Sequence, residues 1–327
     1  MSENSDGPSQ VSTLRRCDLH VHTRHSSWRS GRLLRARDSH TDPIEVYERA
    51  KRAGMDFVAI TDHESIDGCL ALLDARPELE PEIIVGEEVE ARFPDTGQWV
   101  HVNVFGLDEA THRELQRLRP NVLELVGYLR QRRLLHVLNH PFLSYRFQKR
   151  PRAYVEEILE LFDHFEAGNS TMSPGHTEAA EAMLAYARAV GLRKTAVAGS
   201  DAHRPDVVAS SFTLAPGRTA AEWLASVGRG DCVISTVPIG FPRLLANVYC
   251  AVGSYYLDLA RGPGRAGMTP INYLAAAAFL PAATVLGFPA VLTGLNELRQ
   301  RSVLALMRRN LAKLAAAESQ APAEALD

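Results

Sequence analysis

Short runs of β-forming residues alternate with amphipathic helical patterns over the first two thirds of the chain. The runs are Cys17–Thr23, Phe57–Thr61, Ile83–Val89, Val100–Phe105, Leu134–Asn139, His164–Gly168, Ala196–Gly199 and Cys232–Thr236. Most are separated by stretches in which apolar residues recur every three or four positions, as in Pro43–Ala53. Because strands separated by helices form parallel βαβ units, the pattern predicts an α/β protein, either a barrel or a doubly wound sheet.

Histidines and acids gather at the ends of these predicted strands. The set is His20, His22, Asp62, His63, Glu87, Glu88, His101, His140, Glu166, Asp201 and His203. It contains half of the 12 histidines in the chain, which is far more than would lie at strand ends by chance if the histidines were scattered over the surface. Ligands bind at the carboxyl ends of parallel strands, and residues two apart on a strand share a face. His20 and His22 are therefore expected to point together into one site.

Imidazoles mixed with carboxylates indicate a metal site with nitrogen and oxygen ligands. The four cysteines lack the CxxC spacing of a structural zinc site, and they form no evident disulfide framework, which indicates a cytoplasmic location. Nitrogen and oxygen ligands suit Zn, Mn or Fe. Six histidines and several acids exceed the ligands of one ion, so the sequence predicts two or three divalent ions. Metal clusters of this kind cleave phosphate esters.

The ordered series HVH, TDH, GEE, HVN, NHP and GSDAH resembles the PHP (polymerase and histidinol phosphatase) domain family in residue type, order and spacing. The resemblance covers about residues 17–237. It implies a distorted (β/α)7 barrel, here with an α-helical C-terminal extension, and metal-dependent phosphoester hydrolysis. The substrate it implies is a phosphorylated small molecule, a nucleotide or the 5′ end of a short nucleic acid, because the family includes phosphatases and exonucleases.

The resemblance also implies roles for individual residues. His20 and His22 would bind the first metal, and Glu88 would bridge two metals, with Glu87 as its neighbour. His101 and His140 would complete the second site. His63 would belong to the third metal, and Asp201 and His203 would divide between the first and the third. The residues expected to carry the reaction are His20, His22, His63, Asp201 and His203.

One part of the family pattern is different in this chain. The family usually has an aspartate shortly after the HxH motif, whereas Ser27 stands at that position and an arginine-rich insertion follows. Counting back from the helix predicted to begin at Pro43 places the aspartate at Asp38, which we expect to bind the third metal. The insertion is either a solvated loop or a phosphate-capturing site. Its arginines, with the one that follows the HxH motif, are Arg24, Arg29, Arg32, Arg35 and Arg37.

The C-terminal region differs in composition from the rest of the chain. We expect a flexible tail over residues 1–14, the barrel over 15–237 and apolar or amphipathic helices over 238–327. Residues 266–296 carry no charged side chain, and Ile271–Leu295 is long enough to cross a bilayer. The segment is a transmembrane span, a buried pair of short helices or an interfacial anchor. Because Leu298–Leu314 is basic and amphipathic, membrane contact through 271–314 at the inner face is one expectation.

Composition and missing motifs exclude several classes of protein. The net charge of −3 excludes a uniformly positive surface, and no GxSxG elbow or Walker loop is present. A GxGxxG match at residues 262–267 follows no convincing strand, so it indicates a linker. The leading hypothesis is a phosphoesterase. A metal-dependent C–N hydrolase on a related barrel and a non-catalytic, metal-stabilised scaffold at a membrane are the alternatives.

Overall fold

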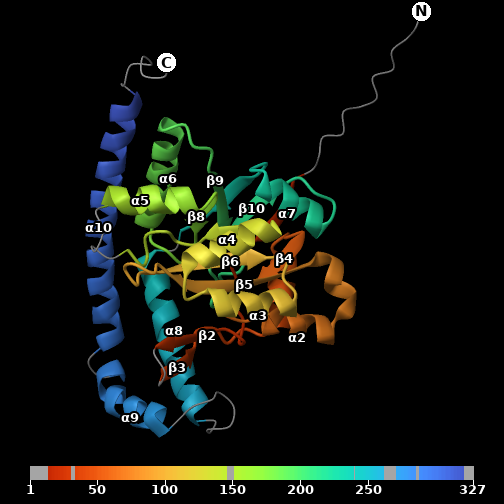
Figure 1. The fold of residues 1–327 in the computed structure, drawn as a ribbon. Helices are drawn as coiled ribbons and strands as arrows, with labels where there is room; N and C mark the ends of the chain where they lie inside the picture. The colour runs from red at the N-terminus through yellow and green to blue at the C-terminus, as the bar shows by residue number, and fades with distance from the viewer. Residues whose placement is uncertain are drawn as a thin grey trace, which may run out of the picture.

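A nine-stranded mixed sheet curls into a nearly closed barrel in the computed structural model (Figure 1). The structure describes residues 14–30, 34–145, 151–238, 240–260, 270–284 and 287–319. The order of the strands in the sheet is β11-β10-β1-β4-β5-β6-β7-β8-β9. Their bounds are β1 Arg15–Asp18, β4 Phe57–Ile60, β5 Ile83–Arg92, β6 Trp99–Phe105, β7 His136–Leu138, β8 His164–Asn169, β9 Thr195–Gly199, β10 Ser211–Ala215 and β11 Val233–Thr236.

Side-chain hydrogen bonds bring the two ends of this sheet together. The Thr213 hydroxyl of β10 accepts the Ala198 amide of β9 at 2.9 Å and donates to the Ala198 carbonyl at 3.0 Å. An isolated parallel bridge pairs Val21 with Ala202, just beyond the ends of β1 and β9. These contacts make the sheet barrel-like, so the predicted distorted barrel with a C-terminal helical region is confirmed.

The expectation of parallel strands throughout is wrong at two places. β5 and β6 pair antiparallel because only residues 93–98 connect them, too few for a crossover. β6 and β7 also pair antiparallel, since two successive helices join them and return the chain to the same end. The sequence pattern did not predict β10, which pairs antiparallel with β1, or the β2–β3 hairpin of Ser27–Ser30 and Leu34–Arg37.

Helices cover the barrel and form the C-terminal region. Their bounds are α1 Pro43–Arg52, α2 Asp67–Ala75, the 3-10 helix η1 Pro77–Glu82, α3 Glu109–Leu118, α4 Val122–Arg132, α5 Pro151–Leu161, α6 Pro174–Ala189, α7 Ala220–Gly228, α8 Phe241–Ala260, α9 Pro270–Thr284 and α10 Phe288–Ser319. At α1, Asp42 caps the helix by accepting the Ile44 amide at 2.9 Å, and Pro43 occupies the first turn.

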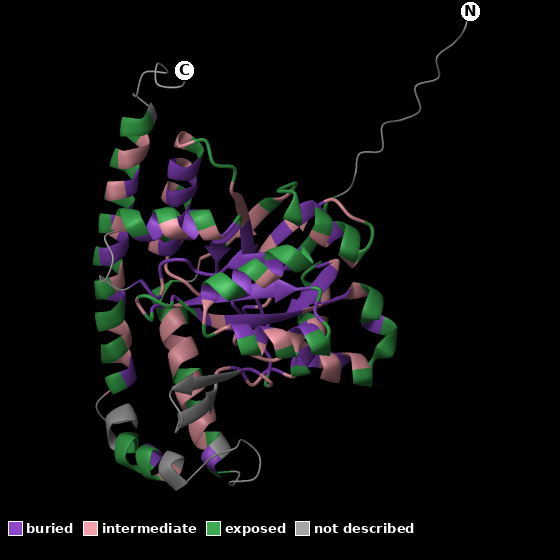
Figure 2. Ribbon diagram, in the orientation of Figure 1, coloured by how far each residue is buried: buried purple, intermediate pink, exposed green. Residues whose placement is uncertain are grey.

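The last helix packs against the barrel along only part of its length. Leu304, Met307 and Leu311 repeat at helical spacing and are buried in one cluster with Ala180 and Met183 of α6. α10 runs along one side of the molecule, and buried residues concentrate where it meets α6 (Figures 1 and 2). The C-terminal half of α10 therefore belongs to the hydrophobic core of the barrel.

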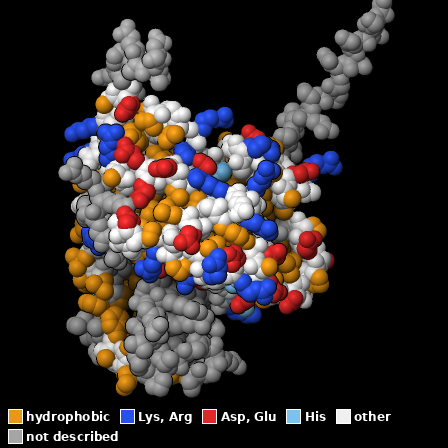
Figure 3. Space-filling view, in the orientation of Figure 1, with side chains coloured by type: hydrophobic (Ala, Val, Ile, Leu, Met, Phe, Trp, Pro, Cys, Tyr) orange, Lys and Arg blue, Asp and Glu red, His pale blue; other side chains and the backbone are white. Residues whose placement is uncertain are grey.

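The apolar segment between α8 and the packed half of α10 presents many side chains to solvent. The exposed large apolar residues of α9 and early α10 are Leu274, Phe279, Leu280, Phe288, Val291, Leu292, Leu295 and Leu298, of which Leu274 is 72% and Leu298 61% exposed. Hydrophobic side chains gather there in the space-filling view (Figure 3). These residues therefore do not form the buried pair of short helices that was one of the three interpretations of the sequence. No described helix is both long and apolar enough to span a bilayer.

Some sequence predictions fall largely outside the described residues. Residues 1–13 of the predicted tail and the GxGxxG match at 262–267 are among them, and so is Arg32. The side chains of Arg29, Arg35 and Arg37 are also outside the description. Arg24, the remaining arginine of that group, pairs with Asp42 at the start of α1.

Burial of His176 on α6 predicts acid sensitivity of the fold. The side chain is buried and the pKa falls from 6.5 to about 4, because burial and the nearby His140 disfavour the charged ring. The unfolded chain then binds a proton more tightly, so stability is lost as pH falls below the unfolded pKa of 6.5. We expect His176 to remove about 2 kcal/mol between pH 7 and pH 5.

Thermal unfolding of the wild type and of His176→Gln over this pH range measures that contribution. The variant should lose less stability than the wild type, because both proteins share every other titrating group. Parallel curves for the two proteins against pH would contradict the assignment.

Candidate metal centre

The backbone at the end of β1 is tied to the loop that follows β9. The buried Asp18 carboxylate accepts the amides of His20 at 3.2 Å, Ser200 at 2.7 Å and Ala209 at 2.8 Å. Burial raises the pKa of Asp18 to about 6, and the hydrogen bonds from Ser200 and the other amides oppose that rise. Asp18 thus fixes the spacing between the HxH motif and the GSDAH motif.

Gly199 permits this close approach. A Cβ atom on Gly199 would lie 2.4 Å from the His20 Cβ, a separation that side chains cannot adopt. Two residues later, Asp201 has a φ of 54°, in the left-handed region that few residues adopt without support. The glycine and the strained aspartate together bring the two segments close enough for their side chains to meet.

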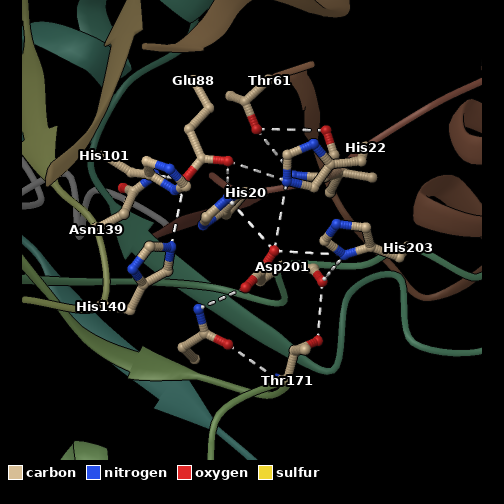
Figure 4. Close-up of polar contacts among 12 residues, drawn as sticks. His20, His22, Thr61, Glu88, His101, Asn139, His140, Thr171, Asp201 and His203 are labelled. Carbon is tan, nitrogen blue, oxygen red and sulfur yellow. Dashed lines mark hydrogen bonds and ion pairs between the residues drawn. The ribbon is translucent and has the colours of Figure 1, made fainter. Parts of the chain in front are cut away.

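Glu88 of β5 lies at the centre of the resulting cluster (Figure 4). Its carboxylate is 1% exposed, and each oxygen faces a different set of imidazole nitrogens. Oε2 lies 3.2 Å from His20 Nε2, 3.3 Å from His22 Nε2 and 3.2 Å from His63 Nδ1. Oε1 lies 3.0 Å from His101 Nδ1 and 3.3 Å from His140 Nε2. One carboxylate is thus shared by two groups of histidines.

Asp201 faces two of the same histidines, His20 and His22, and also His203. Its Oδ1 lies 3.5 Å from His20 Nε2, 3.3 Å from His22 Nε2 and 3.5 Å from His203 Nδ1. The Asn169 side chain donates to the other oxygen at 3.2 Å, which holds the carboxylate in this orientation. Asp201 therefore connects the HxH pair to His203.

Asp38 lies at the mouth of the cluster. Its Oδ2 is 3.2 Å from His63 Nε2 and 3.7 Å from His203 Nε2. The segment that follows the β2–β3 hairpin therefore places this carboxylate beside the two most exposed histidines of the site. Ser26, in the motif that differs from the family, instead contacts His22 Nδ1 at 3.1 Å through its hydroxyl.

The nine predicted metal-site residues all lie in this cluster. Their ligand atoms form four overlapping groups, each within 4.8 Å: His22, Asp38, His63 and His203; His20, His22 and Asp201; His20, Glu88 and His140; and His63, Glu88 and His101. His20 Nε2 and His22 Nε2 are buried and have no hydrogen-bond partner among the described residues. Such nitrogens are costly in an apolar interior, so their convergence on carboxylates fits a set of cation ligands.

Contacts outside the cluster fix the orientation of its histidines. Glu166 of β8 accepts His20 Nδ1–H at 2.8 Å, which turns Nε2 into the site, and accepts the His140 amide at 2.9 Å. The Asn139 side chain donates to Glu88 Oε1 at 2.8 Å. Such outer contacts set the tautomer and angle of metal-binding imidazoles.

Sequence patterns alone did not indicate all of these supporting residues. Glu166, which the sequence placed among the strand-end acids without a role, lies against His20, whereas Glu87 points away and contacts His112 at 2.9 Å. Asn139 and Asn169 were missed, and their only sequence signal is an amide directly at a strand end.

The charges of the site depend on one another. Burial alone lowers the pKa of His22, but the carboxylates of Asp201 and Glu88 raise it to about 10. Burial lowers the pKa of His63 to about 3, although Glu88 and Asp38 oppose this. The pKa of Glu88 lies well below its usual range because burial is outweighed by His20, His63 and His101. The buried carboxylates make the site negatively charged, so it suits metal cations, which compete with protons for the same imidazole nitrogens.

The PHP domain model matches residues 18–191, more than half of the chain. The chain belongs to the PHP domain family. An uncharacterised protein of Methanocaldococcus jannaschii is 34% identical over 74 residues, which are 23% of this chain and 43% of that protein. The chain thus matches less than half the length of this curated relative. PHP membership and the ligand cluster together support a metal-dependent hydrolase.

Two solved structures are similar to the PHP chain at low identity. PsfC from Pseudomonas syringae is 18% identical, with a TM-score of 0.49, and the match covers 75% of this chain and 99% of PsfC. The lesion-specific endonuclease PfuEndoQ from Pyrococcus furiosus is 20% identical, with a TM-score of 0.47. That match covers 68% of this chain and 58% of PfuEndoQ.

Proposed function

We propose that the chain hydrolyses phosphomonoesters with two or three divalent ions held by the cluster. The observation that carries this proposal is the convergence of buried imidazole nitrogens on carboxylates shared between them. His20, His22, Glu88 and Asp201 would hold the first ion, Glu88, His101 and His140 the second, and Asp38, His63 and His203 the third. Mixed imidazole and carboxylate ligands suit Mn, Zn or Fe.

The chain positions the substrate as well as the ions. When bound, divalent ions lower the pKa of water and neutralise charge on a phosphoryl group. His203 and Asp38 have side chains 23% and 17% exposed, whereas those of His20 and His22 are fully buried. The substrate therefore approaches from the side of Asp38 and His203. Glu166 and Ser26 keep His20 and His22 in place while the phosphoryl group is bound.

A panel of substrates distinguishes the phosphomonoesterase from the two alternative functions, a C–N hydrolase and a non-catalytic scaffold. The purified protein with Mn²⁺ should hydrolyse p-nitrophenyl phosphate faster than bis-p-nitrophenyl phosphate, and His20→Ala should be inactive. Hydrolysis of amides or ring amides without hydrolysis of any phosphoester would favour the C–N hydrolase. A metal-dependent rise in melting temperature without hydrolysis of any substrate would favour the non-catalytic scaffold.

We also propose that residues 15–237 carry out the reaction and that residues 238–327 attach the chain to a membrane surface. All of the exposed apolar residues of α9 and early α10 except Leu298 lie within a run of 31 uncharged residues, 266–296. The exposed Arg299 and Arg301 follow that run. An apolar helix followed by exposed arginines suits an anionic lipid surface. We propose that this segment lies in the surface of the inner membrane leaflet.

Vesicle flotation tests this attachment. The full chain should float with vesicles of 30% phosphatidylserine, and Leu292→Ser with Leu295→Ser should weaken binding about tenfold through lost apolar burial. Leu123→Ser is the matched control, because Leu123 is 50% exposed on α4. Equal flotation of the wild type and the double variant would contradict the proposal, and so would a wild type that does not float.

A further inference from the structure

A cavity of about 230 Å³ adjoins the metal cluster on the side of Asp38 and His203. Its far wall is one face of α8, formed by Asn247, Cys250 and Ser254. These positions follow the three-and-four spacing of a helical face. Helix α8 also contacts β3 of the hairpin that leads to Asp38 (Figure 1). A helix beyond the residues matched by the family model therefore closes one side of the space next to the reaction centre.

Two charged side chains that line the cavity, Arg204 and Glu45, already contact other groups of the protein. Arg204, directly after the GSDAH motif, donates to Asp206 at 2.9 Å and to the Cys250 sulfur at 3.3 Å. Glu45 of α1 adds a carboxylate to the lining and lies 3.6 Å from Arg49. A second phosphate group would meet this carboxylate and that of Asp38, and would compete with Asp206 for Arg204. The cavity is therefore poorly suited to a bisphosphate.

The remaining polar groups of the cavity favour a hydroxylated ligand. The Asn247 Nδ2 atom is buried and has no hydrogen-bond partner among the described residues, although an amide of this kind usually has one. Ser254 and Thr41 add groups that both donate and accept hydrogen bonds. No Phe, Tyr or Trp is among the described residues that line the cavity, so the only rings there for a nucleobase to stack on are the imidazoles of His40 and His203.

We propose that this cavity holds the sugar or polyol portion of a phosphomonoester, with the Asn247 amide as its specificity-determining donor. The proposal rests on the phosphomonoesterase function proposed above. A volume of about 230 Å³ suits a single sugar-sized group rather than a polynucleotide. The phosphoryl group would lie at the Asp38 and His203 side, and the hydroxyl groups would point toward α8. A donor, a carboxylate and hydroxyls together recognise vicinal hydroxyl groups.

The ratio of kcat/KM for ribose 5-phosphate to that for p-nitrophenyl phosphate tests this assignment. The wild type should prefer ribose 5-phosphate to both p-nitrophenyl phosphate and AMP by at least about tenfold, because burying an unpaired amide opposes binding of analogues without hydroxyls. Asn247→Ala should lower the ratio about tenfold, mainly through KM for the sugar phosphate. Leu257→Ala, an exposed position on α8 outside the cavity, should keep the wild-type ratio.

Protection of Cys250 gives a second readout that does not depend on turnover. Cys250 is an exposed, free thiol that lines the cavity, and Cys232 serves as a reference thiol in the same chain. Excess ribose 5-phosphate should slow the labelling of Cys250 by iodoacetamide relative to Cys232, and p-nitrophenyl phosphate should do so less.

The outcomes separate this inference from the function on which it rests. An unchanged ratio in Asn247→Ala, a wild-type preference for AMP, or labelling of Cys250 that ignores ribose 5-phosphate would overturn the sugar site while leaving the phosphatase intact. Absence of hydrolysis of every phosphomonoester would instead overturn the proposed function.

Discussion

Replacing Glu88 with glutamine is expected to lower kcat/KM for p-nitrophenyl phosphate by about a thousandfold. The substitution keeps the shape of the side chain but removes the negative charge that faces five histidines. Because each oxygen of Glu88 serves a different group of nitrogens, the change weakens two ion sites at once. The bound metal, measured by mass spectrometry of the dialysed protein, should fall by more than one ion per chain.

Glu87→Gln is the matched control for this variant. Glu87 is the next residue of the same strand and is as buried as Glu88, but it contacts His112 and Gln116 instead of the cluster. It should retain the wild-type metal content. Loss of metal in Glu87→Gln together with retention in Glu88→Gln would show that the wrong carboxylate has been assigned.

Replacing Asp38 with alanine is expected to remove one ion and to lower kcat/KM about a hundredfold. Asp38 is the only carboxylate within reach of both His63 Nε2 and His203 Nε2 among the described residues. The other three groups of ligand atoms do not include Asp38, so the ions that they hold should remain. Metal analysis of the variant should therefore show a loss of one ion, whereas His20→Ala should lose ions from the deeper sites.

The Asp38 result also shows whether the third metal site is kept in spite of the arginine-rich insertion. A loss of one ion means that Asp38, which directly follows the β2–β3 hairpin, replaces the aspartate that the family usually has shortly after the HxH motif. Unchanged metal stoichiometry and an unchanged rate would show that Asp38 is no ligand, and that the third site is absent or is completed by another group.

The position of the site could be predicted from the sequence because of how strands end. Residues such as His63 and His140 come two or three positions after the ends of short buried strands, and the carboxyl ends of neighbouring parallel strands meet at one place whatever the helices between them do. The structure brings six of the nine predicted residues together for that reason, whereas Glu88 and His101 lie within β5 and β6, and Asp38 follows the β2–β3 hairpin. The prediction did not require the direction of each strand, which was wrong for β6.

Other features depend on tertiary structure that local patterns do not contain. β10 is five residues long and buries the polar Ser211 and Thr213 while Phe212 and Leu214 are only half-buried, so its hydrophobic pattern does not predict the face that it buries. Asn139 and Asn169 act only through the carboxylates beside them. The wall that α8 adds to the cavity depends on how a distant helix packs, which no pattern within residues 241–260 indicates.

Metal removal and replacement test the central claim most directly. The full-length protein is stripped with EDTA, dialysed and titrated with Mn²⁺, while bound metal and hydrolysis of p-nitrophenyl phosphate are measured in the same samples. Stripping should abolish activity, and activity should return as two or three ions bind per chain. Full activity in the stripped protein would contradict a metal-dependent reaction at the cluster, and so would binding of two or three ions without hydrolysis of any phosphomonoester.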